Sequence, residues 1–308
     1  MTVTLKQLQQ LVVLAEERNF RRAADRLFIA QPALSVSIQK MERQLGVTLV
    51  QRDSRGATLS PAGEAMLQEA RSTLFHAEQA CNLAQGAGAG EVGILRLGFV
   101  NSAIYELLPA TLNRFRTRYP QIQFDLSEDS TWEITRRIQT FELDAGIVRG
   151  PIAPSANLET WVIQHDDLML VVPEHHRLAG RKSISLKECK SEEFVLFGSS
   201  RTPGLHSVAM ALCHAAGFRP RISQEAIQVQ TLVGLVASGT GIALVPAITR
   251  NHTRARAQFI RLTDPGARRC VSLSLAARPD LLPSTVQRLH EIMLSTQSAG
   301  DAAEAAPT

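Results

Sequence analysis

Amide, hydroxyl and small side chains gather on one side of a short segment, QPALSVSIQKMERQLG (residues 31–46). Leu34, Ile38, Met41 and Leu45 recur at helical spacing and give this segment one apolar stripe. The opposite face is mainly polar. Its amides and hydroxyls can hydrogen-bond base edges in a major groove, and its small side chains allow close approach. The residues that we expect to face DNA are Gln31, Pro32, Ala33, Ser35, Val36, Gln39 and Lys40.

A second group of polar side chains follows strand-like runs in the last two thirds of the chain. These side chains occur in FVNSA, EDST, AGIVRG and FGSSRTPG. In open α/β sheets, ligands lie beyond the carboxyl ends of the strands, where helix N-termini offer free N–H groups. Hydroxyls and guanidinium groups that converge there suit a small carboxylate, although helix capping is the alternative role for any single Ser or Thr. The candidate contacts are Asn101, Ser102, Thr131, Arg149, Ser200, Arg201 and Thr202.

The N-terminal residues predict the helices that must position the first group. Thr4 and Gln7 form a capping-box signature ahead of an amphipathic helix that runs to about Glu17. Asn19 can cap a short second helix. The paired alanines of FRRAADRL would let the helix at residues 31–46 approach closely, which is helix-turn-helix geometry.

A short hairpin is expected directly after this third helix. The stretch VTLVQRDSRGATLS alternates apolar residues around a polar turn that contains glycine. Arg52 and Arg55 on this wing can pair with phosphates, which would position the protein on DNA without specifying bases. Solvated surface is the alternative role for each arginine.

The positive charge is concentrated in the same N-terminal segment. Residues 1–60 carry 9 Lys and Arg against 5 Asp and Glu, which equals the net charge of +4 of the whole chain. A small basic unit on a neutral body is typical of a polyanion-binding head.

A long helix is predicted from Pro61 to about residue 85, since Ser60 and Pro61 form a strong cap and first turn. Its apolar residues are spaced alternately three and four apart, as in a coiled-coil seam. The seam residues are Leu67, Ala70, Leu74, Ala77 and Cys81. A single amphipathic helix packed on its own body would look similar, but two helix-turn-helix heads need a fixed spacing that a dimerising helix supplies. GAGAGEVG at 86–93 then predicts a flexible hinge.

The rest of the chain predicts an α/β body. From Ile94 onward, β-rich runs alternate with amphipathic helices, which is typical of parallel α/β units. We expect an effector-binding domain at 94–296, with subdomain I at 94–164 and 268–296 and subdomain II at 165–267. The tail at 297–308 is poor in apolar residues and is expected to be disordered. The predicted fold class is α/β behind an all-α winged helix-turn-helix at 1–60.

Other classes of protein are disfavoured. No nucleophile elbow, HExxH motif or suitable carboxylate or Cys/His cluster occurs, so we expect neither an enzyme nor a cofactor. The four cysteines lack the close pairs of a zinc site or a disulfide framework, so no metal is expected. Without a run of about 18 apolar residues or a secretion signal, we expect a soluble cytoplasmic protein with no membrane partner.

The segment FRRAADRLFIAQPALSVSIQKMERQLGVTLVQRDSRGATLSPAGEAML resembles the winged helix-turn-helix of the LysR-type transcriptional regulators. The residues that fit the family's pattern without gaps are Ala23, Ala24, Leu27, Gln31, Pro32, Leu34, Ser35, Ile38, Glu42, Leu45, Gly46, Leu49, Arg52, Pro61 and Gly63. Two positions depart from it. Val36 stands where many members carry Arg or another polar residue, and Val50 replaces the usual Phe.

The resemblance continues to about residue 295 and implies two Rossmann-like α/β subdomains, similar to a periplasmic binding protein, with the effector between them. RLGFVNSAIYELLP, LDAGIVRG and VQTLVGLVASGTGIALVPA are most similar to the branch controlling breakdown of benzoate, catechol and chlorocatechol. That likeness implies that Ser102, Thr131, Arg149 and Thr202 contact an aromatic acid or a muconate. Asn101 departs from the smaller residue expected beside that serine.

The resemblance predicts a transcriptional activator whose DNA-bound conformation changes when a small carboxylate closes the cleft. It implies double-stranded promoter DNA, RNA polymerase and further copies of the chain as partners, in a homodimer or homotetramer. The alternative is a solute-binding or enzymatic α/β protein with a basic helical head. Salt-sensitive binding to promoter DNA would favour the regulator, and turnover of an acid would favour the enzyme.

Overall fold

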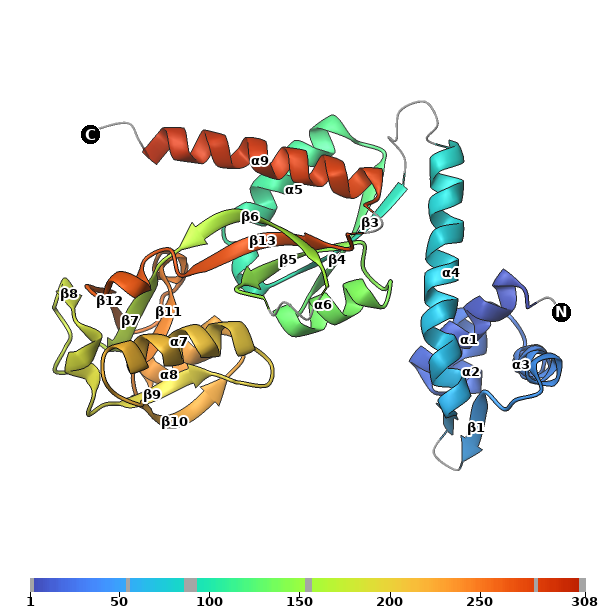
Figure 1. Cartoon of the computed structure of the whole chain (residues 1–308), viewed down its shortest axis with the longest axis horizontal. Coiled ribbons are helices and arrows are strands. Elements are labelled where there is room, and N and C mark those ends of the chain that lie inside the picture. Colours follow the sequence, from blue (N-terminus) through green and yellow to red (C-terminus); the bar gives the residue numbers. More distant parts are fainter. Residues whose placement is uncertain (1–2, 54–55, 86–92, 153–156, 280–281, 305–308) are drawn as a thin grey trace. The chain divides into compact units, whose positions relative to one another are not determined.

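The computed structural model describes residues 3–53, 56–85, 93–152, 157–279 and 282–304. The chain forms two compact units that divide near residue 90, and each is described by itself. Figure 1 labels the helices and strands of both units.

The N-terminal unit consists of four α-helices and a hairpin. Its elements are α1 (Leu5–Glu17), α2 (Phe20–Arg26), α3 (Gln31–Leu45), β1 (Val50–Asp53), β2 (Gly56–Leu59) and α4 (Pro61–Gln85). The predicted capping box is confirmed, because the Thr4 hydroxyl accepts from the Gln7 N–H while the Gln7 side chain accepts from the Thr4 N–H. Asn19 caps α2 by accepting from two backbone N–H groups.

The core of this unit lies where α1, α2 and α3 meet. Ala23 and Ala24 of α2 are almost fully buried, and α2 contacts both α1 and α3. Small side chains at this crossing allow the close approach that the sequence predicted. Gly46 ends α3 in the left-handed conformation, with a φ of 70°. β1 and β2 pair antiparallel, so the predicted hairpin is confirmed.

The helix predicted at 61–85 is present as α4, which packs along α1. Of the predicted seam residues, Ala70 is already buried within the single chain, whereas Leu67, Leu74 and Ala77 are half-buried and Cys81 is exposed. The predicted hinge at 86–93 lies outside the described residues, apart from Gly93, which begins a strand.

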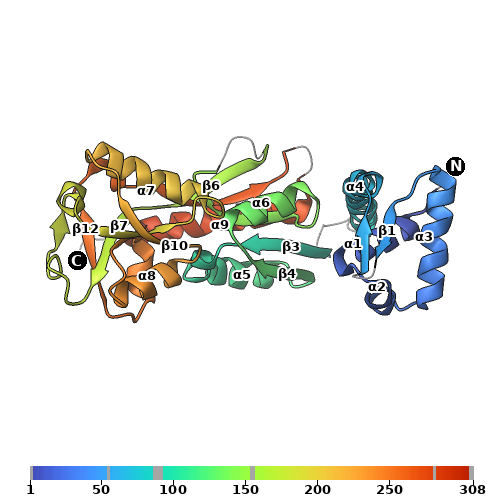
Figure 2. The ribbon, with the colours of Figure 1, turned by 90° about the horizontal axis from the view of Figure 1, so that it is seen from below.

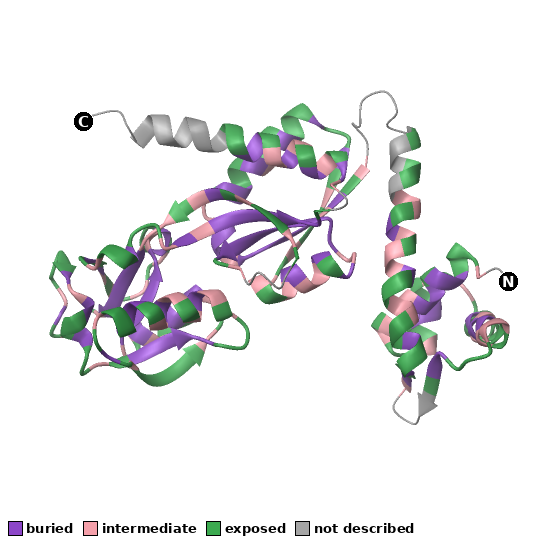
Figure 3. Ribbon diagram, in the orientation of Figure 1, coloured by how far each residue is buried: buried purple, intermediate pink, exposed green. Residues whose placement is uncertain are grey.

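The C-terminal unit contains a five-stranded sheet with helices on both faces. Its elements are β3 (Gly93–Phe99), η1 (Asn101–Ile104), α5 (Leu107–Arg118), β4 (Ile122–Glu128), α6 (Thr131–Gln139), β5 (Ala145–Gly150), β6 (Glu159–Asp166), β13 (Val271–Ala277) and α9 (Ser284–Glu304). The strand order is β4-β3-β5-β13-β6, with β3 parallel to β4 and β5, and β13 antiparallel to β5 and β6. α5 and α9 cover one face and α6 the other (Figure 1). Figure 3 shows the central strands buried between these helices.

A second group of strands lies at the other end of this unit (Figure 2). Its elements are β7 (Leu168–Pro173), β8 (Ser183–Ile184), η3 (Leu186–Cys189), β9 (Glu193–Phe197), α7 (Pro203–Ala215), β10 (Arg221–Ala226), α8 (Val229–Ala237), β11 (Ala243–Pro246), η4 (Ala247–His252), β12 (Ala257–Leu262) and η5 (Pro265–Ala267). One sheet has the order β11-β7-β12-β8, and β9 pairs in parallel with β10. The chain crosses from the first group at Asp167 and returns through η5.

Two expectations from the sequence need correction. The sheets are mixed rather than parallel, since β7 is antiparallel to both β11 and β12. β7 is buried along most of its length because it is an interior strand of its sheet. A continuous apolar run in the sequence shows that a strand is buried, but it does not show whether the neighbouring strands are parallel or antiparallel. In addition, α9 continues to Glu304, so residues 297–304 are helical rather than disordered, in keeping with the high helix propensity of alanine. The rest of that tail, 305–308, lies outside the described residues.

Candidate functional sites

The first site is the outward face of α3. Leu34, Ile38 and Met41 are buried on its inner face, as the apolar stripe predicted. Six of the seven residues expected to face DNA are exposed, and Ser35 is half-buried. The six exposed residues are Gln31, Pro32, Ala33, Val36, Gln39 and Lys40. This helix therefore presents one mainly polar face to its surroundings.

Hydrogen bonds from the middle and from the C-terminal part of α3 fix its position. The Ser37 hydroxyl donates to the Gln10 side-chain oxygen on α1 over 2.5 Å. The Glu42 carboxylate accepts from the N–H groups of Leu49 and Val50 at the start of the hairpin, over 2.8 and 3.0 Å. The sequence identified neither Ser37 nor Gln10, because such positioning contacts depend on the helix crossing.

The N-terminus of α3 has no side-chain cap, since its N-cap residue is Ala30. It offers few free N–H groups to an anion, because Pro32 has none and the Ala33 N–H donates to the Ala30 carbonyl over 2.9 Å. Of the two predicted phosphate contacts on the wing, Arg52 lies in β1, and Arg55 lies outside the described residues.

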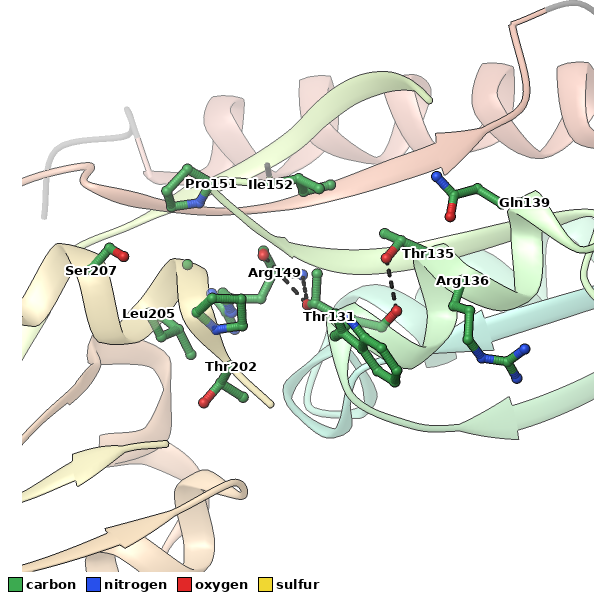
Figure 4. Close-up of a pocket in the computed structure, with 13 residues that line it drawn as sticks. Thr131, Thr135, Arg136, Gln139, Arg149, Pro151, Ile152, Thr202, Leu205 and Ser207 are labelled. Atoms are coloured by element: carbon green, nitrogen blue, oxygen red, sulfur yellow. Dashed lines mark hydrogen bonds between the residues drawn. The ribbon is translucent and has the colours of Figure 1, made fainter. Parts of the chain in front are cut away.

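The second site is a cavity of about 460 Å³ in the C-terminal unit. It lies where α6 and the end of β5 meet the N-terminus of α7, as Figure 4 shows. Its lining residues are Thr131, Trp132, Thr135, Arg136, Gln139, Arg149, Pro151, Ile152, Thr202, Pro203, Gly204, Leu205 and Ser207. The two groups of strands thus contribute opposite walls.

Besides Arg136, the charged residue that lines this cavity is Arg149. Its guanidinium is buried, donates to the Ser102 hydroxyl over 2.5 Å and lies 3.8 Å from the Asp166 carboxylate. The Thr131 hydroxyl accepts from the backbone N–H of Arg149 over 3.0 Å. Burial lowers the pKa of Arg149 to about 10, although Asp166 opposes that shift. Burial likewise raises the pKa of Asp166.

The predicted contacts divide into three groups. Thr131, Arg149 and Thr202 line the cavity, and Ser102 adjoins it through its bond to Arg149. Asn101, Ser200 and Arg201 are not among the lining residues. The Thr202 hydroxyl donates to the carbonyl of Gly198 over 2.9 Å. The hydrogen bond from Arg136 lowers the pKa of Glu133 on α6, and the nearby positive charge of Arg201 lowers it further.

Asn101 instead takes part in a polar bridge between the two groups of strands. The Gln230 amide on α8 donates to the Asn101 side-chain oxygen over 2.5 Å and to the Tyr105 hydroxyl. The Tyr105 ring stacks on the His252 ring of η4, with centroids 4.6 Å apart. The His252 imidazole lies 3.4 Å from the Glu106 carboxylate. These contacts join the two groups of strands at a second place, in addition to the walls of the cavity.

Gly204 brings the start of α7 close to the chain that follows β5. A Cβ at this residue would lie 2.2 Å from the carbonyl oxygen of Pro151. Real contacts are longer than 3.0 Å, so any side chain here would push α7 away from the end of β5.

Apolar side chains form much of the remaining wall, and the sequence analysis did not identify them. Trp132 is 48% exposed, and with Ile152 and Leu205 it lines the cavity. Their only signal in the sequence is proximity to Thr131, Arg149 and Thr202, because each follows one of these residues by one to three positions.

The described part of the chain contains no group of three or more His, Cys, Asp or Glu residues that could hold a metal ion. None of its helices is both long and apolar enough to cross a membrane.

Comparison with known proteins supplies the context for both sites. The model of the bacterial regulatory helix-turn-helix proteins of the lysR family matches residues 5–64, and that of the LysR substrate binding domain matches residues 88–298. The chain is similar to the transcriptional regulator AlsR of Bacillus subtilis (strain 168), with 36% identity over 244 residues, 79% of this chain and 80% of AlsR. It is similar to the transcriptional regulator BenM of Acinetobacter baylyi, with 33% identity over 265 residues, 85% of this chain and 86% of BenM.

A solved structure extends the likeness. The crystal structure of full-length CbnR complexed with its target DNA matches with a TM-score of 0.72 and 26% identity, over 96% of this chain and 100% of CbnR.

Proposed function

Because the chain belongs to the LysR family of DNA-binding transcriptional regulators, we propose that it changes transcription when a small carboxylate binds beside Arg149. The two family models match a helix-turn-helix and a substrate-binding domain. The names of the relatives describe transcriptional regulators and not enzymes. The proposal concerns the chemistry of the effector and the residues that recognise it.

The observation that carries this proposal is the buried guanidinium of Arg149 at a cavity wall. Burying a cation is costly unless it is paired, and Asp166 at 3.8 Å is too distant for a short ion-pair hydrogen bond. A carboxylate in the cavity would complete the pairing. The Ser102 hydroxyl accepts from the guanidinium and Thr131 accepts from the backbone N–H of Arg149. The bond to Ser102 restrains the arginine side chain, so less side-chain entropy remains to be lost on binding.

The apolar wall of the cavity supports the proposal that the rest of the ligand, apart from its carboxylate, is planar and apolar. Trp132 offers an indole face, and Ile152 and Leu205 offer aliphatic surface. An aromatic acid or a muconate-type acid combines such a body with a carboxylate, in agreement with the branch of the family that the sequence resembles. Thr202 completes the proposed set of contacts.

The DNA contacts that we propose lie on α3 and its flanks. The outward residues of α3 would meet base edges, while the wing arginines Arg52 and Arg55 would meet phosphates. We further propose that copies of the chain pair through the α4 seam into a dimer or tetramer, which acts on RNA polymerase at a promoter as an activator. The effector can shift this assembly only by binding one arrangement more tightly than the other.

A thermal-shift screen of the full chain with aromatic acids and muconates tests this function. A ligand at 100 times its Kd should stabilise the folded state by about 2.7 kcal/mol. Arg149→Ala should abolish that shift while retaining salt-sensitive binding to promoter DNA. Equal shifts for Arg149→Ala and the unaltered chain would rule out the proposed site. Ser207→Ala, at another point of the lining, serves as the matched control.

A further inference from the structure

Val36 occupies the middle of the outward face of α3. It is 58% exposed, and it lies one turn beyond Pro32 and Ala33 and one turn before Lys40. Its isopropyl group therefore stands among the residues that this helix presents outward, with its apolar surface uncovered in the free chain. A β-branched residue gives no advantage to an exposed helix surface, where straight-chain and polar residues have higher helix propensity.

The charged side chains of α3 lie in its second half, so ion pairs with phosphates and contacts to bases fall on different parts of the helix. The nine residues from Gln31 to Gln39 include no charged side chain, whereas Lys40 and Arg43 follow in the second half. Side chains in the first half therefore cannot form ion pairs with phosphates. Their chemistry is limited to hydrogen bonds from amides and hydroxyls, which can reach phosphates or base edges, and to apolar contacts, which can reach only the bases and sugars.

The major groove offers one apolar group to such a surface, the C5-methyl of thymine. We propose that Val36 contacts the C5-methyl of one thymine in each half-site and so selects thymine at that position. The inference rests on DNA recognition by α3 and adds to it the base that this residue reads. Cytosine pairs differently and lacks the methyl group, and uracil differs from thymine only by that group.

Uracil substitution provides a direct test. The full chain is bound to a duplex from the region upstream of its own gene, and the protected half-sites are located by footprinting. Each thymine is then replaced by uracil, in both half-sites together, and the Kd is measured by fluorescence anisotropy. At one thymine position the loss of a buried methyl should weaken binding about four-fold per half-site.

Val36→Ala identifies the residue responsible. This variant removes the two methyl groups without disturbing the helix, because alanine has the highest helix propensity. It should bind the thymine and uracil duplexes equally well. Val47→Ala is the matched control, since Val47 is 46% exposed but lies beyond the end of α3. This control should keep the difference between the thymine and uracil duplexes, about four-fold per half-site.

Two results would overturn the proposal. One is equal binding by the unaltered chain to thymine and uracil at every position. The other is a difference that persists in Val36→Ala. Absence of any specific binding to the duplex is a separate outcome, because it would overturn the DNA-binding role of α3 and this inference with it.

Discussion

The guanidinium of Arg149 lies 3.8 Å from the carboxylate of Asp166, and both side chains are largely removed from solvent. Arg149 is in β5, and Asp166 ends β6 just before the chain crosses to the second group of strands. Burial lowers the pKa of the arginine and raises the pKa of the aspartic acid, so each group is less favoured in its charged form than in water. A carboxylate ligand would therefore compete with Asp166 for the same cation.

Asp166→Asn should strengthen binding of a carboxylate ligand. The variant removes the competing negative charge while keeping an acceptor near the Ile248 N–H. At the short range of this pair, the change in affinity should be at least about threefold. Isothermal titration calorimetry measures it, and weaker binding by the variant would contradict competition. The ligand-free variant should be at least as stable as the unaltered chain near neutral pH, because burial disfavours the charged form of Asp166 and the amide is neutral.

The raised pKa of Asp166 also fixes the direction of a pH effect on stability. The folded chain keeps the proton at pH values where the unfolded chain, with the ordinary pKa of 3.8, has released it. Protonated Asp166 therefore makes its full contribution to the stability of the folded chain below pH 3.8, and this contribution is lost as pH rises through the folded-state pKa. Asp166→Asn lacks this loss, so its Tm relative to that of the unaltered chain should rise as pH increases from 3.8 towards neutrality. A relative Tm that falls over this range would contradict the assignment.

Trp132 should report ligand binding through its fluorescence. The chain has two tryptophans, of which Trp132 lines the cavity and Trp161 packs against His290, with ring centroids 4.7 Å apart. An aromatic acid should change the emission of the unaltered chain and of Trp161→Phe but not that of Trp132→Phe. Loss of the indole in Trp132→Ala should weaken binding of aromatic acids about fivefold, as expected for one stacking contact. Unchanged affinity in Trp132→Ala would exclude the indole as part of the site.

Gly204→Ala should separate the two walls of the cavity. The new Cβ cannot remain 2.2 Å from the Pro151 carbonyl oxygen, so α7 must move away from β5. We expect at least about a tenfold loss of ligand affinity, because misplaced contacts on both walls each weaken binding. Gly234→Ala on α8 is the control, since its Cβ would meet nothing within 4 Å. Similar ligand affinities for the two variants would show that the close approach is not required.

Leu74→Glu tests the α4 seam. A carboxylate at this half-buried position would be buried in a helix pair, and the association constant of the dimer should fall at least about tenfold. Thr73→Glu, at the adjacent exposed position outside the seam, should leave association unchanged. Sedimentation velocity over a range of concentrations compares the two. Equal association by both variants would exclude Leu74 from the interface.

Local patterns in the sequence were sufficient for the N-terminal unit. Thr4 and Asn19 cap helices as predicted, since each needs only N–H groups two or three residues away. The apolar stripe of α3 also identified its buried face, because helical spacing fixes which residues share a side. The hydrogen bond from Ser37 to Gln10 joins residues 27 positions apart, and no local pattern reveals it.

The cavity was only partly predictable. Thr131 and Arg149 were identified because each stands at the carboxyl end of a strand or at the start of the helix that follows. Ser200 and Arg201 occupy a similar place after β9 but do not line the cavity, since the chain turns into α7 with Pro203 and Gly204 facing that space. Trp132 belongs to the wall because of the tertiary arrangement, which spacing along the chain does not encode.

Because the first half of α3 is uncharged, the affinity of the protein for DNA and its preference among DNA sequences depend on different side chains. Affinity for DNA decreases steeply with salt because phosphate contacts release counterions, whereas methyl and amide contacts to bases release none. A rise in ionic strength would therefore lower the affinity for every operator by a similar factor. The ranking of operators by affinity would stay the same, so salt would change how tightly the protein binds without changing which sequences it prefers.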